Sequence, residues 1–173
     1  MSFNGEAFHA QVFSPGRITA ELVRAIDASR ERVDVANFSF TSEALRDALL
    51  RAKTRGVSVR IVFDEGQYKF LSEMHWFREN GFDVRLTKGK DGSKGVMHNK
   101  YAVFDGRLVV NGSFNWTRNA EKNNYENALF LDAPDDIAAY LTFFERIRDE
   151  AREPADGDHV GPRSMPDDFN PAH

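Results

Sequence analysis

Hydrophobic positions recur along the chain with two alternating periods, and this pattern predicts a succession of helices and strands. Residues 18–29, 42–52 and 69–80 carry apolar side chains at helical spacing, and Gly56 and Gly81 stand where the second and third helices are expected to end. Residues 32–40, 57–63 and 82–87 alternate apolar with polar positions, which is typical of strands. The first half of the chain therefore predicts strands that alternate with helices.

The second half predicts adjacent strands followed by a last helix. Residues 88–95 (KGKDGSKG) form a polar loop, and residues 98–105 and 107–113 form two strands joined at Asp105–Gly106, which permits a tight antiparallel hairpin. Residues 125–131 predict another strand, and Pro134 stands near the start of an amphipathic helix. The order indicates an α/β fold with a mixed sheet flanked by helices on both faces.

Size and composition indicate one soluble domain. The chain has 173 residues, 41% of them hydrophobic and 29% charged, and it contains no cysteine, which excludes disulfides and thiolate chemistry. We expect one catalytic domain over residues 1–152 and a polar, mobile tail over residues 153–173, where Pro, Asp and Gly dominate. No apolar run approaches the roughly 20 residues of a membrane span, and no signal peptide is recognisable, so we expect a cytoplasmic location without stable membrane association.

Charge is unevenly distributed along the chain. The formal net charge is −4, but residues 85–126 hold eight Lys or Arg against four Asp or Glu, whereas residues 132–173 hold four against eleven. A basic segment inside an acidic protein indicates either a local anion site or an ordinary solvated surface.

The candidate chemistry lies in residues 98–116, HNKYAVFDGRLVVNGSFNW. On a strand, His98 and Lys100 would point to the same face, where an imidazole beside an ammonium suits a phosphate group. Ser113 and Asn115 add a hydroxyl and an amide that could bond phosphate oxygens. Glu126, on the next predicted strand, could hold the His98 ring as in a catalytic triad.

Each of these residues also has a structural interpretation. A single His-x-Lys on a strand is usually a surface feature, Asp105 before a glycine could be only a turn residue, and Ser113 and Asn115 could be strand-end polar residues. Their combination is more informative, because H-x-K-x₄-D followed by G-S-x-N resembles the HKD signature of the phospholipase D superfamily. The similarity extends over about residues 8–147 and includes Asn124-Tyr125-Glu126-Asn127.

The chain carries one such motif, so it resembles the small single-motif branch, which includes bacterial nonspecific endonucleases and the mitochondrial cardiolipin hydrolases. The resemblance implies a homodimer in which two motifs line one site, with no metal or other cofactor. It implies that His98 forms a phosphohistidine while the second chain's imidazole acts as acid and base. Lys100, Asn115 and Ser113 would hold phosphoryl oxygens, Glu126 would orient His98, and Asp105 is expected to be structural, because it lies on the opposite strand face by parity.

The resemblance leaves the substrate open between nucleic acids and lipids. We favour DNA or RNA, because the basic loop residues Lys88, Lys90 and Lys94 precede His98 and could contact a phosphate backbone. The alternatives are a phospholipase and a nucleic-acid-binding module without catalysis. The aromatic residues Tyr101, Phe114 and Trp116 are expected to be core residues rather than base-stacking platforms.

Metal binding has little support in the sequence. The remaining histidines are scattered, and no H-E-x-x-H pattern occurs. Asp64 and Glu65 follow a predicted strand and could in principle bind magnesium, but a solvated strand end is the expected interpretation.

Overall fold

A seven-stranded mixed sheet forms the centre of the computed structural model, which describes residues 1–92 and 94–161. Strands β4, β5 and β6 are parallel, and β4, β7, β8, β9 and β3 pair antiparallel in that order. The strands, in spatial order, are β3 (Gln11–Phe13), β9 (Asn127–Leu131), β8 (Leu108–Gly112), β7 (Lys100–Phe104), β4 (Arg32–Asn37), β5 (Ser58–Asp64) and β6 (Asp83–Thr87). A separate two-stranded ribbon joins β1 (Ser2–Phe3) to β2 (Glu6–Ala7).

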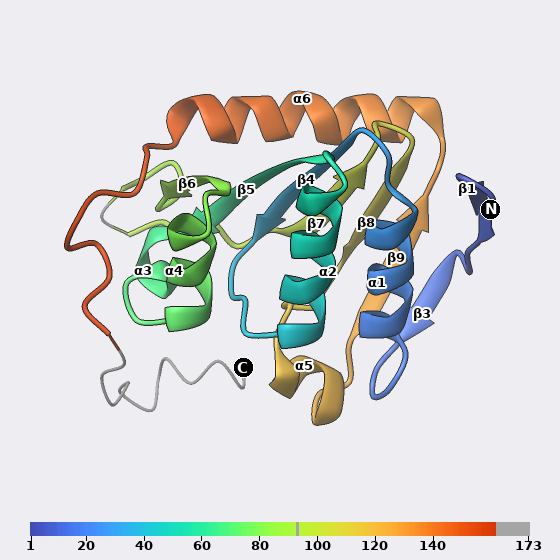
Figure 1. Cartoon of the computed structure of the whole chain (residues 1–173), viewed down its shortest axis with the longest axis horizontal. Helices are drawn as coiled ribbons and strands as arrows, with labels where there is room; N and C mark the ends of the chain where they lie inside the picture. Colours follow the sequence, from blue (N-terminus) through green and yellow to red (C-terminus); the bar gives the residue numbers. More distant parts are fainter. Residues whose placement is uncertain (93, 162–173) are drawn as a thin grey trace.

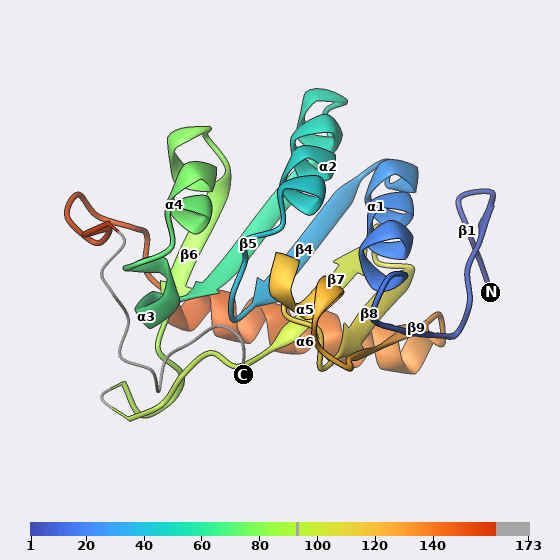
Figure 2. The same ribbon diagram turned by 90° about the horizontal axis from the view of Figure 1, so that it is seen from below.

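Helices cover both faces of the sheet, as predicted. Three helices, α1 (Ile18–Ala28), α2 (Glu43–Thr54) and α4 (Ser72–Glu79), lie on one face, and the long helix α6 (Pro134–Glu150) crosses the other (Figures 1 and 2). The short helix α3 (Glu65–Tyr68) follows β5 directly, and α5 (Arg118–Lys122) connects β8 to β9. None of the helices in the described ranges combines the length and apolarity of a membrane-spanning helix.

The apolar core is divided into two layers by the sheet. The layer beneath α1, α2 and α4 is the larger and includes Leu22, Leu49 and Phe63, while the layer beneath α6 includes Val62 and Phe144. Val62 and Phe63 are consecutive residues of β5 that enter opposite layers, because side chains alternate across a strand. The central strands are therefore buried on both faces, and the polar side chains that β4 and β5 place beneath α6, Asp34 and Arg60, are paired with each other.

The predicted helix cap and the predicted hairpin turn are both present in the structure. The Ser42 hydroxyl accepts a hydrogen bond from the N–H of Leu45 and caps α2. Asp105 and Gly106 both adopt positive φ, at 51° and 61°, which closes the predicted antiparallel hairpin between β7 and β8. The turn requires this left-handed backbone, and Asp-Gly is a sequence that tolerates it.

The structure also departs from the predicted elements. The predicted helix 69–80 is in fact α4 alone, preceded by α3, because the Asp64 side chain caps a new helix immediately after β5. Strands β1, β2 and β3 and helix α5 were not predicted, since each is too short for a period to emerge. The strand predicted from residue 98 begins at Lys100, so His98 lies in the preceding loop.

Residues 153–161, part of the predicted mobile tail, pack beside α3 and α4. Arg152 exchanges two backbone hydrogen bonds with Leu86 at the edge of β6 and forms an ion pair with Asp158 at 2.7 Å. The His159 ring stacks on His75 of α4 with a centroid distance of 4.6 Å. The rest of the predicted tail, residues 162–173, lies outside the described residues.

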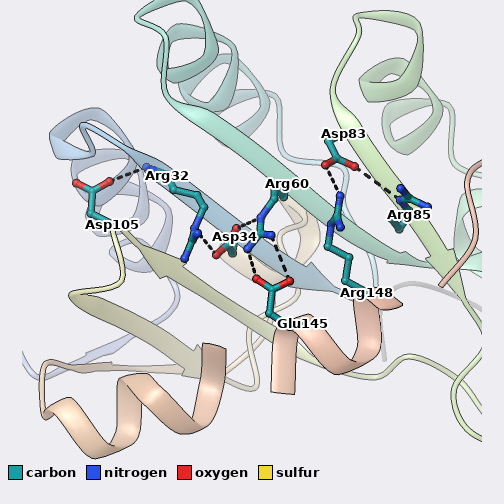
Figure 3. A network of polar contacts seen from close by, with 8 residues as sticks. All are labelled: Arg32, Asp34, Arg60, Asp83, Arg85, Asp105, Glu145 and Arg148. Carbon is teal, nitrogen blue, oxygen red and sulfur yellow. Dashed lines mark hydrogen bonds and ion pairs between the residues drawn. The ribbon is translucent and has the colours of Figure 1, made fainter. Parts of the chain in front are cut away.

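A charged network fixes α6 to its face of the sheet (Figure 3). Asp34 of β4 lies at its centre with a side chain only 1% exposed, and it contacts the Nε atoms of Arg60 at 2.6 Å and Arg32 at 2.9 Å. Arg60 also binds Glu145 of α6 at 2.7 Å. The helix is thus held by directional ion pairs as well as by the apolar layer beneath it.

Candidate active site

The strand directions bring the predicted site residues to one edge of the sheet. Because β4, β7, β8 and β9 are successively antiparallel, β4 and β8 end at the edge where β7 and β9 begin. Lys100 opens β7, Ser113 follows β8, and Glu126 precedes β9. Strand β5, parallel to β4, also ends at this edge with Asp64. Residues far apart in the sequence therefore meet because of topology.

His98 and Lys100 meet around Phe38, which follows β4. The Phe38 N–H donates to the Asn99 carbonyl at 2.9 Å, so the end of β4 continues alongside the segment that enters β7. The His98 ring lies edge-on to the Phe38 ring with a centroid distance of 4.8 Å. Lys100 Nζ donates to the His98 carbonyl oxygen at 2.8 Å and lies 5.3 Å from the centroid of the Phe38 ring. The imidazole and the ammonium are thus neighbours, although His98 is not on a strand.

Burial changes the protonation of both groups in the same direction. It lowers the pKa of the His98 imidazole, and the Lys100 charge lowers that pKa further, while Asp64 opposes the shift. Burial also lowers the pKa of the Lys100 ammonium, against the effect of Glu126. The His98 ring is consequently biased toward the neutral, nucleophilic form. An anion bound beside Lys100 would stabilise the protonated ammonium of that lysine.

Asp64 fixes the backbone that leads into His98. It is 2% exposed, its Oδ2 accepts from the N–H of Met97 at 2.9 Å, and its Oδ1 accepts from the N–H of Gln67 at 3.0 Å. Burial raises the pKa of this carboxyl group, and the backbone N–H donors oppose the rise. The prediction of a solvated strand end at Asp64 is therefore wrong, since this carboxylate is enclosed and anchors the residue before His98.

Glu126 contacts Ser113 within this chain rather than His98. The Ser113 hydroxyl donates to Glu126 Oε2 in a short hydrogen bond, and Asn124 Nδ2 donates to Oε1 at 2.9 Å. The Asn127 N–H donates to the Ser113 oxygen at 3.1 Å. No hydrogen bond joins Glu126 to the imidazole among the described residues, so the expected orienting role is not seen in a single chain. Its charge instead acts on Lys100, as the pKa of that lysine indicates.

Asn115 lies deeper than the other predicted ligands. It is 8% exposed and sits between the buried side chains of Phe114 and Trp116. Its Oδ1 has no hydrogen-bond partner among the described residues. Beside it, Asn37 Oδ1 accepts from the Trp116 N–H at 3.3 Å. The Asn115 amide therefore has unused hydrogen-bonding capacity, and only a small part of it reaches the surface.

Asp105 lies at the opposite edge of the sheet, where β7 ends. Its carboxylate accepts the backbone N–H groups of Arg30, Glu31 and Arg32 at 2.8–2.9 Å and the amide of Asn4 at 2.7 Å. Burial alone would raise the pKa of Asp105, but these donors outweigh it and lower the pKa. The contacts are those of a structural carboxylate that fixes a turn.

The basic loop and the interleaved aromatic residues differ in accessibility. Lys88, Lys90 and Lys94 are all exposed, and Lys88 lies 3.6 Å from Glu65 of α3. By contrast, the aromatic residues of the candidate segment are buried core residues, namely Tyr101, Phe114 and Trp116. Among residues 1–92 and 94–161, no three His, Cys, Asp or Glu side chains gather in a way that could hold a metal ion.

Two residues of the site, Phe38 and Asp64, were not predicted as site residues. The sequence predicts a strand over residues 32–40, which includes Phe38, and a solvated strand end at Asp64. The only available signal was that each follows a predicted strand, and strand ends often carry functional side chains. Their contacts depend on pairings between β4, β5 and β7 that a single sequence does not define.

Comparison with protein families gives a match over most of the chain. The family model described as "Cardiolipin synthase, PLD-like domain" matches residues 22–148. The mitochondrial cardiolipin hydrolase of Chlamydomonas reinhardtii is 36% identical over 125 residues, which are 72% of this chain and 54% of that protein. The human mitochondrial cardiolipin hydrolase is 38% identical over 130 residues, 74% of this chain and 50% of that protein. The chain thus spans about half the length of these relatives.

Comparison with solved structures includes two matches that cover nearly the whole of the matched chains. The crystal structure of Nuc, a phospholipase D family member from Salmonella typhimurium, superposes with a TM-score of 0.74 at 28% identity and covers 82% of this chain and 94% of that one. NucT from Helicobacter pylori superposes with a TM-score of 0.73 at 25% identity, covering 82% and 96%. The mixed sheet and its two helical layers are therefore the architecture of these proteins.

Proposed function

The chain belongs to the phospholipase D superfamily of phosphodiesterases, and we propose that it is a metal-independent endonuclease that hydrolyses DNA or RNA. The observation that carries the proposal is the Lys100 ammonium beside the His98 imidazole. Within the described residues, no carboxylate lies at ion-pair distance from Lys100, whose polar contact is with the His98 carbonyl. A cation without a counter-ion next to a neutral imidazole suits binding of a phosphate and attack on its phosphorus.

The proposed reaction has two displacement steps. In the first, a nitrogen of His98 bonds to phosphorus while the bond to the leaving oxygen breaks, and that oxygen takes a proton from His98 of the partner subunit. In the second, His98 of the partner subunit takes a proton from water as the water oxygen attacks phosphorus and releases His98. Lys100 and Asn115 would stabilise the phosphoryl oxygens through ammonium and amide donors, and Ser113 would assist once its hydroxyl turns from Glu126 to the phosphate.

Exposed apolar side chains lie near the site residues in the sequence or in strand register, where a second chain could cover them. Tyr125, next to Glu126, is 95% exposed, and Phe13 and Val96 are also exposed. Phe13 pairs in register with Asn127, and Val96 lies two residues before His98. Large exposed apolar side chains are typical of association surfaces, and burial of these residues would place two copies of the site edge against each other. This supports the homodimer that one motif per chain requires.

Nucleic acid is the favoured substrate for two reasons. The sequence resembles the branch that includes bacterial nonspecific endonucleases, and the fold superposes on Nuc with a TM-score of 0.74. In addition, Lys90 and Lys94 are exposed on the loop that leads to His98. A lipid phosphodiester is the second candidate, favoured by the 36–38% identity to proteins named cardiolipin hydrolase.

A substrate panel tests the proposal. Purified protein is incubated in excess chelator with single- and double-stranded DNA, with RNA, and with anionic phospholipid vesicles. We expect cleavage of nucleic acid, and we expect His98→Ala to reduce it by roughly 10³-fold or more. The matched control is His75→Ala, which removes an imidazole on α4 outside the site edge. Headgroup release without nucleic-acid cleavage would favour the phospholipase, and binding without turnover of any phosphodiester would favour a noncatalytic module.

Mixing of subunits tests whether two chains share one site. Wild-type protein is exchanged with increasing amounts of His98→Ala, and activity is expressed per wild-type chain. If both imidazoles act on the same phosphorus, mixed dimers are inactive, and a ninefold excess of the variant should reduce this value to about a tenth. Activity per wild-type chain that stays constant would place the whole reaction within one chain and refute the dimeric mechanism.

A further inference from the structure

Phe38 lies where two functional groups of the candidate site meet. It directly follows β4, and its backbone N–H donates to the Asn99 carbonyl. The His98 ring approaches its ring at 4.8 Å with an interplanar angle of 67°, and Lys100 Nζ lies 5.3 Å from its centroid. Asn99 thus anchors the backbone of Phe38, and the Phe38 ring contacts both neighbours of Asn99 in the sequence, His98 and Lys100.

Packing of the core does not account for the position of this ring. Phe38 is only half-buried and belongs to neither of the two apolar layers of the described residues. Phe40, two positions further along, is fully buried and packs against Phe63, Phe77 and Trp116. Phe40 is therefore a core residue, whereas the ring of Phe38 contacts the site residues His98 and Lys100.

We propose that Phe38 is a positioning residue for the proposed phosphodiester reaction, because its ring orients the His98 imidazole and accepts the Lys100 ammonium on its π-face. The proposal rests on the function proposed above. It assigns to Phe38 no contact with the reacting atoms and no part in proton transfer.

The orientation of His98 depends on this contact more than is usual for a histidine. Among the described residues, no hydrogen bond holds either ring nitrogen of His98, so no carboxylate or carbonyl fixes its rotation in this chain. The edge-on arrangement with Phe38 is one that aromatic pairs favour, and it excludes water from one side of the imidazole. Both ring nitrogens are left without a competing partner, which keeps them available to phosphorus.

Lys100 is held by the same ring in a way that preserves its function. A cation over an aromatic face is stabilised without neutralisation, whereas a carboxylate partner would compete with phosphate for the ammonium. The hydrogen bond from Nζ to the His98 carbonyl defines the other end of the arrangement. The ammonium is therefore placed beside the imidazole with its charge available to an anion.

Loss of the ring has a defined effect on protonation. The charged groups that act on this pair are Lys100 and Asp64 on His98, and Glu126 on Lys100. Without Phe38, the partly exposed imidazole would be more fully hydrated, and Lys100 would be held near it only by the hydrogen bond to the His98 carbonyl. Both changes raise the pKa of His98, because burial and the Lys100 charge are the causes that lower it. The neutral nucleophile would then be available only at higher pH.

The test compares Phe38→Ala, Phe38→Leu and Phe38→Tyr with wild-type protein, using Phe143→Leu as control because Phe143 is an exposed ring on α6. The pH dependence of kcat/KM is measured on the cleaved substrate, and the titration of His98 is followed separately by NMR. We expect the Ala variant to lose roughly 10- to 100-fold in kcat and to shift the acid limb upward by about half a unit or more. The Leu variant should be intermediate, and Tyr should restore both values.

The outcomes separate this proposal from the proposed function. If folded Ala and Leu variants titrate His98 at the wild-type pH and keep the wild-type acid limb, the positioning role is refuted. If wild-type protein cleaves none of the phosphodiesters but the NMR titration still shifts in the Ala variant, the contact stands and the proposed function fails. Thermal unfolding followed by circular dichroism establishes that each variant is folded, and Phe38→Leu, which also lacks the aromatic ring, keeps the test open if Ala does not fold.

Discussion

Asp34 offers a sharp test of what holds α6 to the sheet. Replacing it with Ala removes a carboxylate with a 1%-exposed side chain and leaves Arg60, whose side chain is 15% exposed, with Glu145 as its remaining partner. Removing one member of a buried ion pair costs about 3–5 kcal/mol, because the Arg60 charge stays largely buried and is then only partly compensated, by Glu145. Since domains are stable by about 5–15 kcal/mol, the variant should lose about a fifth of its stability or more.

The assay is urea denaturation followed by circular dichroism, with Asp83→Ala as the matched control. Asp83 lies 2.6 Å from Arg148 in the same network, but its side chain is 40% exposed, so its loss should cost less than about 1 kcal/mol. For a chain of this size, the Asp34 variant should also melt about 6–20 °C lower. Equal losses in the two variants, or a loss below about 1 kcal/mol for Asp34→Ala, would refute the argument from burial.

The same network predicts a pH dependence of stability. The hydrogen bond from Arg60 lowers the pKa of Glu145, with further contributions from the charges of Arg60, Arg32 and Arg148. A folded-state pKa below the unfolded value contributes stability above the unfolded pKa, and this contribution is lost as the pH falls through the folded value. Glu145→Gln should therefore be less stable than wild type at neutral pH, and the difference should disappear in acid. A difference that persists at acid pH would contradict this assignment.

Three further predictions concern the edge of the sheet. Asp64→Ala should cost about 1–3 kcal/mol of stability in urea denaturation for each N–H left unpaired, and it should lower activity in the cleavage assay because the backbone at Met97 loses its partner. Asp64→Asn keeps an acceptor and should retain more stability and more activity. Gly112→Ala should destabilise by about 1–3 kcal/mol or more in the same denaturation assay, because the added methyl would overlap the backbone carbonyl oxygen of Asn127 on the neighbouring strand β9. Tyr125→Ser should weaken the proposed dimer about tenfold or more in sedimentation equilibrium, whereas Leu50→Ser on α2 should not.

The sequence predicted the elements whose signals are local. The Asp105–Gly106 hairpin follows from two residues that tolerate positive φ, and the start of α2 follows from Ser42 as a cap. The alternation in residues 57–63 predicted β5 to within a residue at each end. These signals act within a few residues of the chain, so no knowledge of the partner strands was needed.

The remaining features depend on contacts that are remote in the sequence. β3 has three residues and exists because it pairs with β9, more than a hundred positions away. The burial of Asp64 depends on Met97, and the partner of Glu126 proved to be Ser113 rather than His98. Residue types indicated the chemistry at this edge, but register and side-chain rotation determine which of the polar groups contact one another.

Strand β7 explains how one motif can contain both a chemical and a structural end. Its five residues, at about 3.3 Å each, carry the chain from the edge with Lys100 to the opposite edge with Asp105. There the Asp105 N–H donates to the Arg32 carbonyl at 2.7 Å, and its carboxylate binds the backbone at the start of β4. These bonds fix the register of β4 against β7, and that register determines where Phe38 meets the other end of the strand. Asp105 thus acts on the candidate site through strand alignment, at a distance that proton transfer could not span.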